Sequence, residues 1–495
     1  MIRILVISTK FRIIIHKTYG NSMYNRPSDN HQTSMFGDLE SMLDQKHPLY
    51  VLAKLIHWEL FEEEFKKHYC QNNGSMAKPI RRMVGLILLK HIRNVSDESV
   101  VEQFSENAYY QYFCGEQAFT CKPPCVPTEL VQFRKRIGEA GIELILKESI
   151  RVNMELEDRK KERDRKSNGK SNRGRKPEEE QTAFIDTTVQ EKNVTFPTDS
   201  KLLNKVVEYS HNIAREEGIR LHQTFAKEIK QLKLVQRFRG RSHSAKKVKK
   251  ADKRMRTIAG ILLREIVRNL PEENPYKELL DTCMKFVNGE KYDGHKIYSL
   301  HEPDVLCIGK GKDHVKYEFG NKVSITRLWN GIIIGAMSFR NEYDGHTIDR
   351  SMEQVERIFG RPLKFLSGDR GYRGQESCGD TKIEIPSVPK SSDTAYARQK
   401  KHKLFCKRAG IEPVIGHCKS DHRLSRNFYK GLFGDFINVM LAAAAFNFKR
   451  VLNLLLCPIL NLLNMVLIWL EVLVRIRKTA SESYQSWNLP YAMTF

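Results

Sequence analysis

The order of elements predicted between residues 180 and 430 most constrains how this chain can fold. Residues 182–189 (TAFIDTTV) have strand character, and the residues from 200 to about 288 have the apolar spacing of long helices. Strand patterns return over 295–340, with hairpin signals at 309–311 and at Asn330-Gly331. A short helix (347–360), a strand (362–369) and further helix follow. This series predicts a mixed α/β core and excludes a β-sandwich.

Residues on either side of this core have different patterns. Residues 35–157 have apolar positions at helical spacing, with a turn at Asn94-Val95 and a second helix capped by Ser96. We expect a helical DNA-binding domain there, with a plain helical bundle as the alternative. Residues 158–180 are rich in Lys, Arg, Gly, Ser and Asn, which predicts a basic linker.

The helical domain and the linker set the bounds of the α/β domain and of the N-terminal extension. We expect the α/β domain to span 181–450, with its helical insertion at about 200–290. Residues 1–34 read as a poorly ordered extension, in which Met1 and Met23 are candidate starts, as is Met35 just beyond it.

Residues 451–495 are predicted to form an apolar C-terminal helix and tail. The stretch 451–470 has no charged residue and is long enough to span a membrane. Its three asparagines, Asn453, Asn461 and Asn464, fall on one side of a helix. An amphipathic packing helix is therefore favoured, and membrane insertion is the alternative.

The charge of the chain points to a polyanionic partner. The 83 Lys and Arg residues outnumber the 59 Asp and Glu residues, for a net charge of +24. Such a surface suits nucleic acid or an anionic membrane. A hydrophobic content of 40% excludes a disordered chain, and ten scattered cysteines suit a reducing compartment.

Three acidic residues lie at positions suited to metal-dependent chemistry. Asp186 lies in a predicted strand, Asp369 just past the end of another, and Glu412 in a helical segment. Mg²⁺ prefers carboxylate oxygens, and two such ions can promote an in-line phosphoryl displacement. In a strongly basic chain, these acids indicate chemistry on nucleic acid.

The segment around Glu412 has the most specific spacing. On a continuous helix, Phe405, Arg408, Glu412 and Lys419 would fall within an arc of about 60°. Pro413 and Gly410 disfavour such a helix, so it is expected to kink there or to begin at Pro413, which would place Glu412 near a helix N-terminus. A surface ion pair between Arg408 and Glu412 is the simpler alternative.

This spacing resembles that of the bacterial insertion-sequence DDE transposases that carry a Tyr-(2)-Arg-(3)-Glu-(6)-Lys signature. Here the signature is Phe405-(2)-Arg408-(3)-Glu412-(6)-Lys419, so the tyrosine hydroxyl is missing. The phrases DTTVQEKN, PTDSKLL, KYEFGNKVS, NEYDGHT, GDRGYRG and GIEPVIGHCKSDHRL are similar to the insertion-sequence-five-like branch. The resemblance spans about residues 36–450.

The resemblance implies an RNase H-like catalytic core. Asp186, Asp369 and Glu412 would be the catalytic acids and would bind Mg²⁺, for which Mn²⁺ is expected to substitute. The implied reactions are cleavage at the ends of the element and transfer of the 3′-OH into target DNA. The implied protein is a homodimer or higher multimer in the bacterial cytoplasm, bound to double-stranded DNA in the nucleoid and without a stable membrane partner. A catalytically inactive, transposase-derived DNA-binding protein is the alternative.

Several basic residues are candidates for DNA contact. The resemblance implies that Arg408 and Lys419 touch the cleaved DNA end. Arg370 follows the second acid. Lys322 lies on a predicted strand and could point at a phosphate, although an exposed strand lysine is the simpler alternative. The basic run 237–256 adds Arg237, Arg239 and Arg241. Contacts from this run would set affinity for the phosphate backbone without reading sequence, and an exposed charged helix is the simpler alternative.

Overall fold

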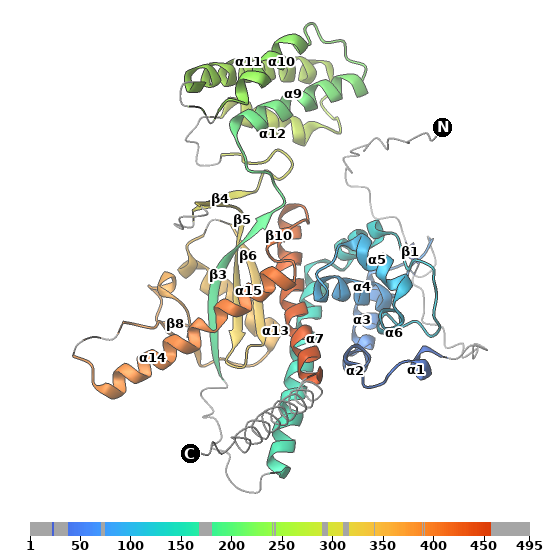
Figure 1. Ribbon diagram of the computed structural model, residues 1–495, viewed down its shortest axis with the longest axis vertical. Coiled ribbons are helices and arrows are strands. Elements are labelled where there is room, and N and C mark those ends of the chain that lie inside the picture. The colour runs from blue at the N-terminus through green and yellow to red at the C-terminus, as the bar shows by residue number, and fades with distance from the viewer. Residues whose placement is uncertain are drawn as a thin grey trace, which may run out of the picture. The chain divides into compact units, whose positions relative to one another are not determined.

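The computed structural model describes residues 22–23, 38–70, 75–167, 181–239, 241, 244–289, 296–309, 316–340, 342–388, 390 and 392–456 (Figure 1). Most of the predicted extension 1–34, the basic linker beyond residue 167 and the apolar run beyond residue 456 lie outside these residues. The chain divides into two compact units, 1–25, 68–77 and 177–442 in the first and 26–67, 78–176 and 443–495 in the second. A short parallel pair, β1 (Ser22–Met23) with β2 (Ser75–Met76), belongs to the first unit.

The second unit is helical, as the sequence predicted. Ser96 caps its helix as expected, because its hydroxyl accepts a 3.1 Å hydrogen bond from the Ser99 N–H. The longest helix is kinked at Gly138, where φ is 64°, and it continues to Ser167. The basic stretch expected to be linker from residue 158 therefore begins as helix. The elements are α1 (Leu39–Met42), α2 (Pro48–Leu55), α3 (Trp58–Phe65), η1 (Lys66–His68), α4 (Ile80–Ile92), α5 (Asp97–Glu106), α6 (Ala108–Phe113) and α7 (Pro127–Ser167).

A buried ion cluster joins three helices of this unit. Asp97 accepts two hydrogen bonds from the Arg134 guanidinium, at 2.9 and 2.8 Å. The Lys90 ammonium lies 3.0 Å from the same carboxylate. Burial alone would raise the pKa of Asp97, but the hydrogen bonds and charges of Arg134 and Lys90 outweigh it and lower the pKa to about 2. The cluster therefore holds α4, α5 and α7 together through ionised groups.

A mixed sheet forms the centre of the first unit, which confirms the predicted α/β class. Its strand order is β4-β5-β3-β7-β9-β8, with β6 also paired to β5 and β10 to β3. The pairs β3–β5 and β5–β6 are antiparallel, whereas β3–β7 and β7–β9 are parallel. The strands are β3 (Thr182–Lys192), β4 (Leu306–Gly309), β5 (Tyr317–Leu328), β6 (Ile333–Phe339), β7 (Phe365–Ser367), β8 (Ser377–Cys378), β9 (Thr381–Glu384) and β10 (Arg426–Asn427).

Helices cover both faces of this sheet. The Ser351 hydroxyl of α13 lies 3.4 Å from that of Ser324 on β5, whereas Arg327 of β5 binds the Lys407 carbonyl of α14 at 2.7 Å. Ser324 and Arg327 are three positions apart on one strand, so they point to opposite faces. The elements are η3 (Asp344–Thr347), α13 (Ile348–Phe359), η4 (Arg370–Tyr372), α14 (Ala395–Ala409) and α15 (Ile411–Asp421).

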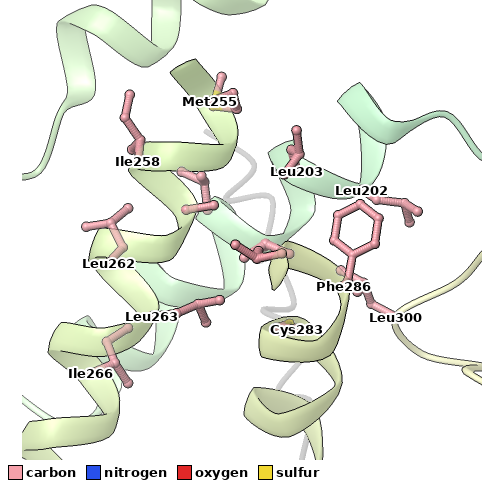
Figure 2. Packing of buried hydrophobic residues seen from close by; sticks show 14 of the residues in the cluster. Leu202, Leu203, Met255, Ile258, Leu262, Leu263, Ile266, Cys283, Phe286 and Leu300 are labelled. Carbon is pink, nitrogen blue, oxygen red and sulfur yellow. The ribbon is translucent and has the colours of Figure 1, made fainter. Parts of the chain in front are cut away.

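The helical insertion has a hydrophobic core of its own (Figure 2). Ile258, Leu262 and Ile266 recur at the spacing of one helix face and are fully buried against the neighbouring helices. This spacing is the signal that predicted helices here. The four helices are α9 (Asp199–Glu216), α10 (Ala226–Gln236), α11 (Ala245–Asn269) and α12 (Lys277–Asn288).

One helix among the described residues, Gly431–Leu456, is long and apolar enough to cross a membrane by length and composition alone. In its most apolar stretch 61% of the residues are buried inside the structure, as in a core helix of a soluble protein. It also carries polar groups with protein partners: Asn447 binds the Ser149 hydroxyl at 3.0 Å, and Arg450 binds Asn153 at 2.7 Å. These bonds favour the packing-helix alternative for the residues up to Leu456.

Candidate active site

The first predicted acid lies on the central strand of the sheet. Asp186 pairs with Ile325 across the antiparallel β3–β5 ladder. Its carboxylate accepts a 2.9 Å hydrogen bond from the Thr187 N–H, and its side chain is 13% exposed. A half-buried carboxylate on a strand with neighbours on both sides is held in a fixed position, which a metal ligand requires.

The second predicted acid follows the neighbouring strand. Because β3 and β7 run parallel, with Phe184 opposite Ser367, the chain leaves β7 beside Asp186. Asp369 then caps a short 3₁₀ turn, and its Oδ1 accepts a 2.8 Å hydrogen bond from the Gly371 N–H. A Cβ on Gly371 would lie 3.0 Å from Asp369 Oδ1 and 3.1 Å from Asp344 Oδ2, so two carboxylates face one glycine.

The third predicted acid begins a new helix. The chain breaks at Gly410 between α14 and α15, and Glu412 lies in the first turn of α15. Pro413 is tolerated there because the first turn of a helix has no backbone acceptor for its N–H groups. The sequence left open a kink near Gly410 or a helix that begins at Pro413. The structure is closer to the kink, because Gly410 has φ −62° and ψ −7° and α15 begins at Ile411, two residues before Pro413. Glu412 lies near the N-terminus of α15, as expected.

Arg408 links the first and third acids. Its guanidinium donates to Asp186 Oδ2 at 2.9 Å and to Glu412 Oε1 at 3.2 Å. Arg408 is 14% exposed, whereas Glu412 is 63% exposed. The ion pair of Arg408 with Glu412, which the sequence offered as a simple surface feature, therefore exists, but it extends inward to Asp186.

The charges of the three acids act on one another. Burial raises the pKa of Asp186 to about 6, the Arg408 charge partly opposes this, and the charges of Asp369 and Glu412 add to it. A pKa of about 6 leaves Asp186 mostly ionised at neutral pH, so its carboxylate is available as a ligand. The structure thus brings together Asp186, Asp369, Glu412 and Arg408, which are widely separated in sequence.

The donors suit a hard divalent cation in kind. All three acids offer carboxylate oxygens, which Mg²⁺ prefers. In the part of the chain that the structure describes, no three acidic, His or Cys side chains are already grouped closely enough to hold one ion. The Arg408 guanidinium lies between Asp186 and Glu412 and pairs with both. A metal at these acids would therefore need Arg408 to turn away.

A cavity of about 500 Å³ opens beside Asp369 and Arg408. Cationic and apolar side chains share its wall, and Phe405, at the position of the signature tyrosine, is 54% exposed. Such a lining suits a phosphate with an attached sugar or base. The residues around the cavity are Asp369, Arg370, Pro386, Ser387, Val388, Lys401, His402, Phe405 and Arg408.

The other predicted DNA contacts have different surroundings. Arg370 is exposed at the cavity, and Lys419 is half-buried on α15, seven residues after Glu412. Lys322 is 23% exposed and engaged within the protein, because its ammonium lies 3.2 Å from Asp344 Oδ1 and 3.0 Å from the Glu342 carbonyl. The sequence did not predict Asp344; its only signal was its place in the phrase NEYDGHT.

Three arginines of the insertion were also predicted to contact DNA, and none of them lines the cavity. Arg237 and Arg241 are exposed, and Arg241 lies over the Phe238 ring, 5.0 Å from its centroid. Arg239 pairs with Asp252 and also reaches the Ser200 hydroxyl. Arg239 therefore helps to fix the fold of the insertion.

Comparison with known proteins identifies the family. Residues 37–136 match the family described as a transposase domain (DUF772), a stretch that runs from α1 into α7 of the helical unit. A Rhizobium meliloti protein described as "Uncharacterized protein ORF8 in nfe locus" is 34% identical over 204 residues, which are 41% of this chain and 90% of that protein. The chain belongs to a family of insertion-element transposases. No solved structure matches it.

The residues that match the family model lie mainly in the helical unit. The matched residues include α4 and α5 with their Ser96 cap and the Asp97 ion cluster, so that cluster stabilises the part of the transposase by which the family is recognised.

Proposed function

We propose that the chain is a DDE transposase of the insertion-sequence-five-like branch. It would cleave DNA at the ends of its element and transfer the exposed 3′-OH into target DNA. Asp186, Asp369 and Glu412 would be its catalytic acids, and Mg²⁺ its cofactor, with Mn²⁺ able to substitute. The observation that carries the proposal is the ion pair of Arg408 with both Asp186 and Glu412, beside Asp369.

The sheet supports an RNase H-like core for this site. Its three antiparallel strands β6, β5 and β3 are followed by the parallel strands β7 and β9. The first acid lies on β3 and the second just past β7, so both come from adjacent strands. This geometry supports the fold that the sequence resemblance implies.

The three acids would act by holding the metal ions that the reaction needs. Bound Mg²⁺ ions would activate the attacking water or 3′-OH and stabilise the leaving oxygen of the displacement. Asp186 and Asp369 would hold them from the sheet, and Glu412 from α15. Both reactions are phosphoryl transfers with the same needs, so one set of acids serves both.

Arg408 would have two roles. Without DNA it pairs with Asp186 and Glu412 and reduces the repulsion between them. With DNA bound, its planar guanidinium would turn to a phosphate of the cleaved end, since that geometry suits bidentate contact. Lys419, on the same helix as Glu412, and Arg370 would add phosphate contacts. Arg237 and Arg241 would bind DNA from the insertion, and Lys322 would act mainly through Asp344.

The transposase would work as a homodimer or higher multimer that brings two element ends together. It would do so on double-stranded DNA in the bacterial cytoplasm, at the nucleoid and without a stable membrane partner.

The test uses the DNA that flanks the reading frame. The full chain is incubated with labelled duplexes carrying those flanks, with Mg²⁺, with Mn²⁺ or with EDTA. We expect cleavage at a fixed position with either metal, none with EDTA, and none from Asp369→Asn with either metal. Asp281→Asn, an exposed acid of the insertion, is the matched control and should cleave normally. Binding of the flanks without cleavage would instead indicate the inactive DNA-binding alternative.

A further inference from the structure

The helix α14 is unusual because all of its side chains are at least partly exposed to solvent. None of its fifteen residues is buried. It carries six Lys and Arg residues and no acid. Figure 1 shows α14 extending from the sheet, so that its first turns lie clear of the other helices. A helix that buries no side chain gains little from packing in the free protein, so its exposed faces are available to a partner.

One face of α14 belongs to the candidate active site. Lys401, Phe405 and Arg408 all line the cavity beside Asp369. Lys401 is also held by Asp393 at 2.7 Å. In the proposed reaction, this face of α14 would contact the DNA end that reacts.

The opposite face of α14 has no such role. At about 100° per residue, Lys400 and Lys403 lie within about 40° of Tyr396, and the cavity-lining residues lie about 120–180° away from it. Tyr396 is 78% exposed, and both lysines are exposed. In the part of the chain that the structure describes, neither lysine pairs with an acid. We call Tyr396, Lys400 and Lys403 the outward face of α14.

We propose that the outward face of α14 binds the phosphate backbone of the target DNA duplex. This inference rests on the transposase reaction proposed above. Transfer of a 3′-OH into target DNA requires two DNA segments at one set of acids. The end that reacts occupies the cavity face, so a duplex on the outward face is separated from it by the width of α14, about 10 Å.

The chemistry of the outward face fits this partner. Lysine ammonium groups bind phosphates without regard to base sequence, as a target contact with little sequence demand needs. A tyrosine beside them offers a hydroxyl to phosphate and a ring to the sugar. The absence of acids from α14 removes the repulsion that would oppose a polyanion.

The first experiment measures binding of the full chain to a random 30-base-pair duplex by fluorescence anisotropy between 50 and 200 mM salt. Each phosphate contact contributes a slope of about 0.9 to the fall of log affinity with log salt. We expect Lys400→Gln/Lys403→Gln to lower that slope by about 2. Lys277→Gln/Lys285→Gln, which removes two exposed lysines from α12, should leave it unchanged.

The second experiment measures strand transfer and cleavage separately, so that a defect in target binding is distinguished from a defect at the element end. A pre-cleaved end is offered with a plasmid target, and an uncleaved end is offered without one. For Lys400→Gln/Lys403→Gln we expect strand transfer to fall about tenfold at 200 mM salt and cleavage to stay within about twofold. Lys400→Arg/Lys403→Arg should restore transfer, because it keeps both charges.

Three results would overturn the inference. An unchanged salt slope in Lys400→Gln/Lys403→Gln would show that these lysines do not contact phosphate. An equal loss of cleavage and transfer would assign the outward face to the element end. Loss of multimers in the variant with normal duplex binding would assign it to a second copy of the chain. If the wild-type chain cleaves nothing, the proposed function fails, but the salt slope on random duplex still tests the contact.

Discussion

Arg408 and Asp186 are 222 positions apart in the sequence, and their side chains meet at 2.9 Å. Arg408 also reaches Glu412 at 3.2 Å across the break between α14 and α15. One cation thus holds an acid from the central strand and an acid from a separate helix. The charge balance of the candidate site depends on this residue.

Removal of Arg408 should make Asp186 harder to ionise. The Arg408 charge lowers the pKa of Asp186, which burial has raised to about 6. We expect Arg408→Gln to raise that pKa further, by about one unit. Carboxyl carbon NMR of Asp186 in the metal-free protein reports this directly, without requiring activity. Arg408→Lys keeps the charge and should shift the pKa less; equal pKa values in Arg408→Gln and wild type would contradict the expectation.

Asp186→Asn should stabilise the metal-free protein while abolishing cleavage. The pKa of Asp186 rises from 3.8 to about 6 on folding, so between these values the native state keeps a proton that the unfolded chain has released. The free energy of unfolding therefore falls as pH rises through this window, by up to about 3 kcal/mol at neutral pH. Asparagine mimics the protonated form and avoids the cost.

Hydrogen exchange of the β3 amides measures this difference. Asp186→Asn should gain protection over wild type at pH 7.5 and gain almost none at pH 3.5, where Asp186 of the wild type is protonated in the native state and mostly protonated in the unfolded state. Asp281→Asn, which is exposed on α12, should match wild type at both pH values. A gain of equal size at both pH values would mean that titration of Asp186 is not its source.

Gly371→Ala should weaken metal binding more than folding. The added methyl group would lie 3.0 Å from Asp369 Oδ1 and 3.1 Å from Asp344 Oδ2, so both carboxylates would have to move. We expect Mg²⁺ affinity, measured by calorimetry, to fall about tenfold. Gly416→Ala on α15 places its methyl where no atom lies within 4 Å, and it should bind Mg²⁺ as wild type does. A normal Mg²⁺ affinity in Gly371→Ala would show that Asp369 does not bind the metal.

Asp97→Asn should destabilise the helical unit strongly. It would leave Lys90 and Arg134 buried without their shared anion, at a cost of about 3–5 kcal/mol. Folding lowers the pKa of Asp97 from 3.8 to about 2, so its contribution is complete above pH 3.8 and is lost as pH falls through 2. Hydrogen exchange of α5 measures the loss. Asp158→Asn on the exposed surface of α7 is the control; a similar effect of both variants would contradict the burial argument.

The sequence predicted the elements well where local patterns carry the information. Period-3.6 apolar spacing predicted α11 and α13, and Asn330-Gly331 predicted the turn between β5 and β6, where Gly331 has φ 89°. One boundary was wrong, because α7 continues to Ser167 into the basic stretch predicted as linker. The sequence also did not predict that Asp344, 22 positions away, engages Lys322, because that contact depends on the tertiary fold.

By itself, then, the sequence determined the candidate acids, the basic character and the α/β class, because these depend on residue type and local spacing. Tertiary structure decided how the acids meet. Asp186 and Asp369 are adjacent because β3 and β7 pair in parallel, and no local spacing contains that register. Whether Arg408 serves a surface ion pair or the site was also open in the sequence. Folding brings Asp186 to the same guanidinium, so the residue serves both, and α14 keeps one face for the site and another for solvent.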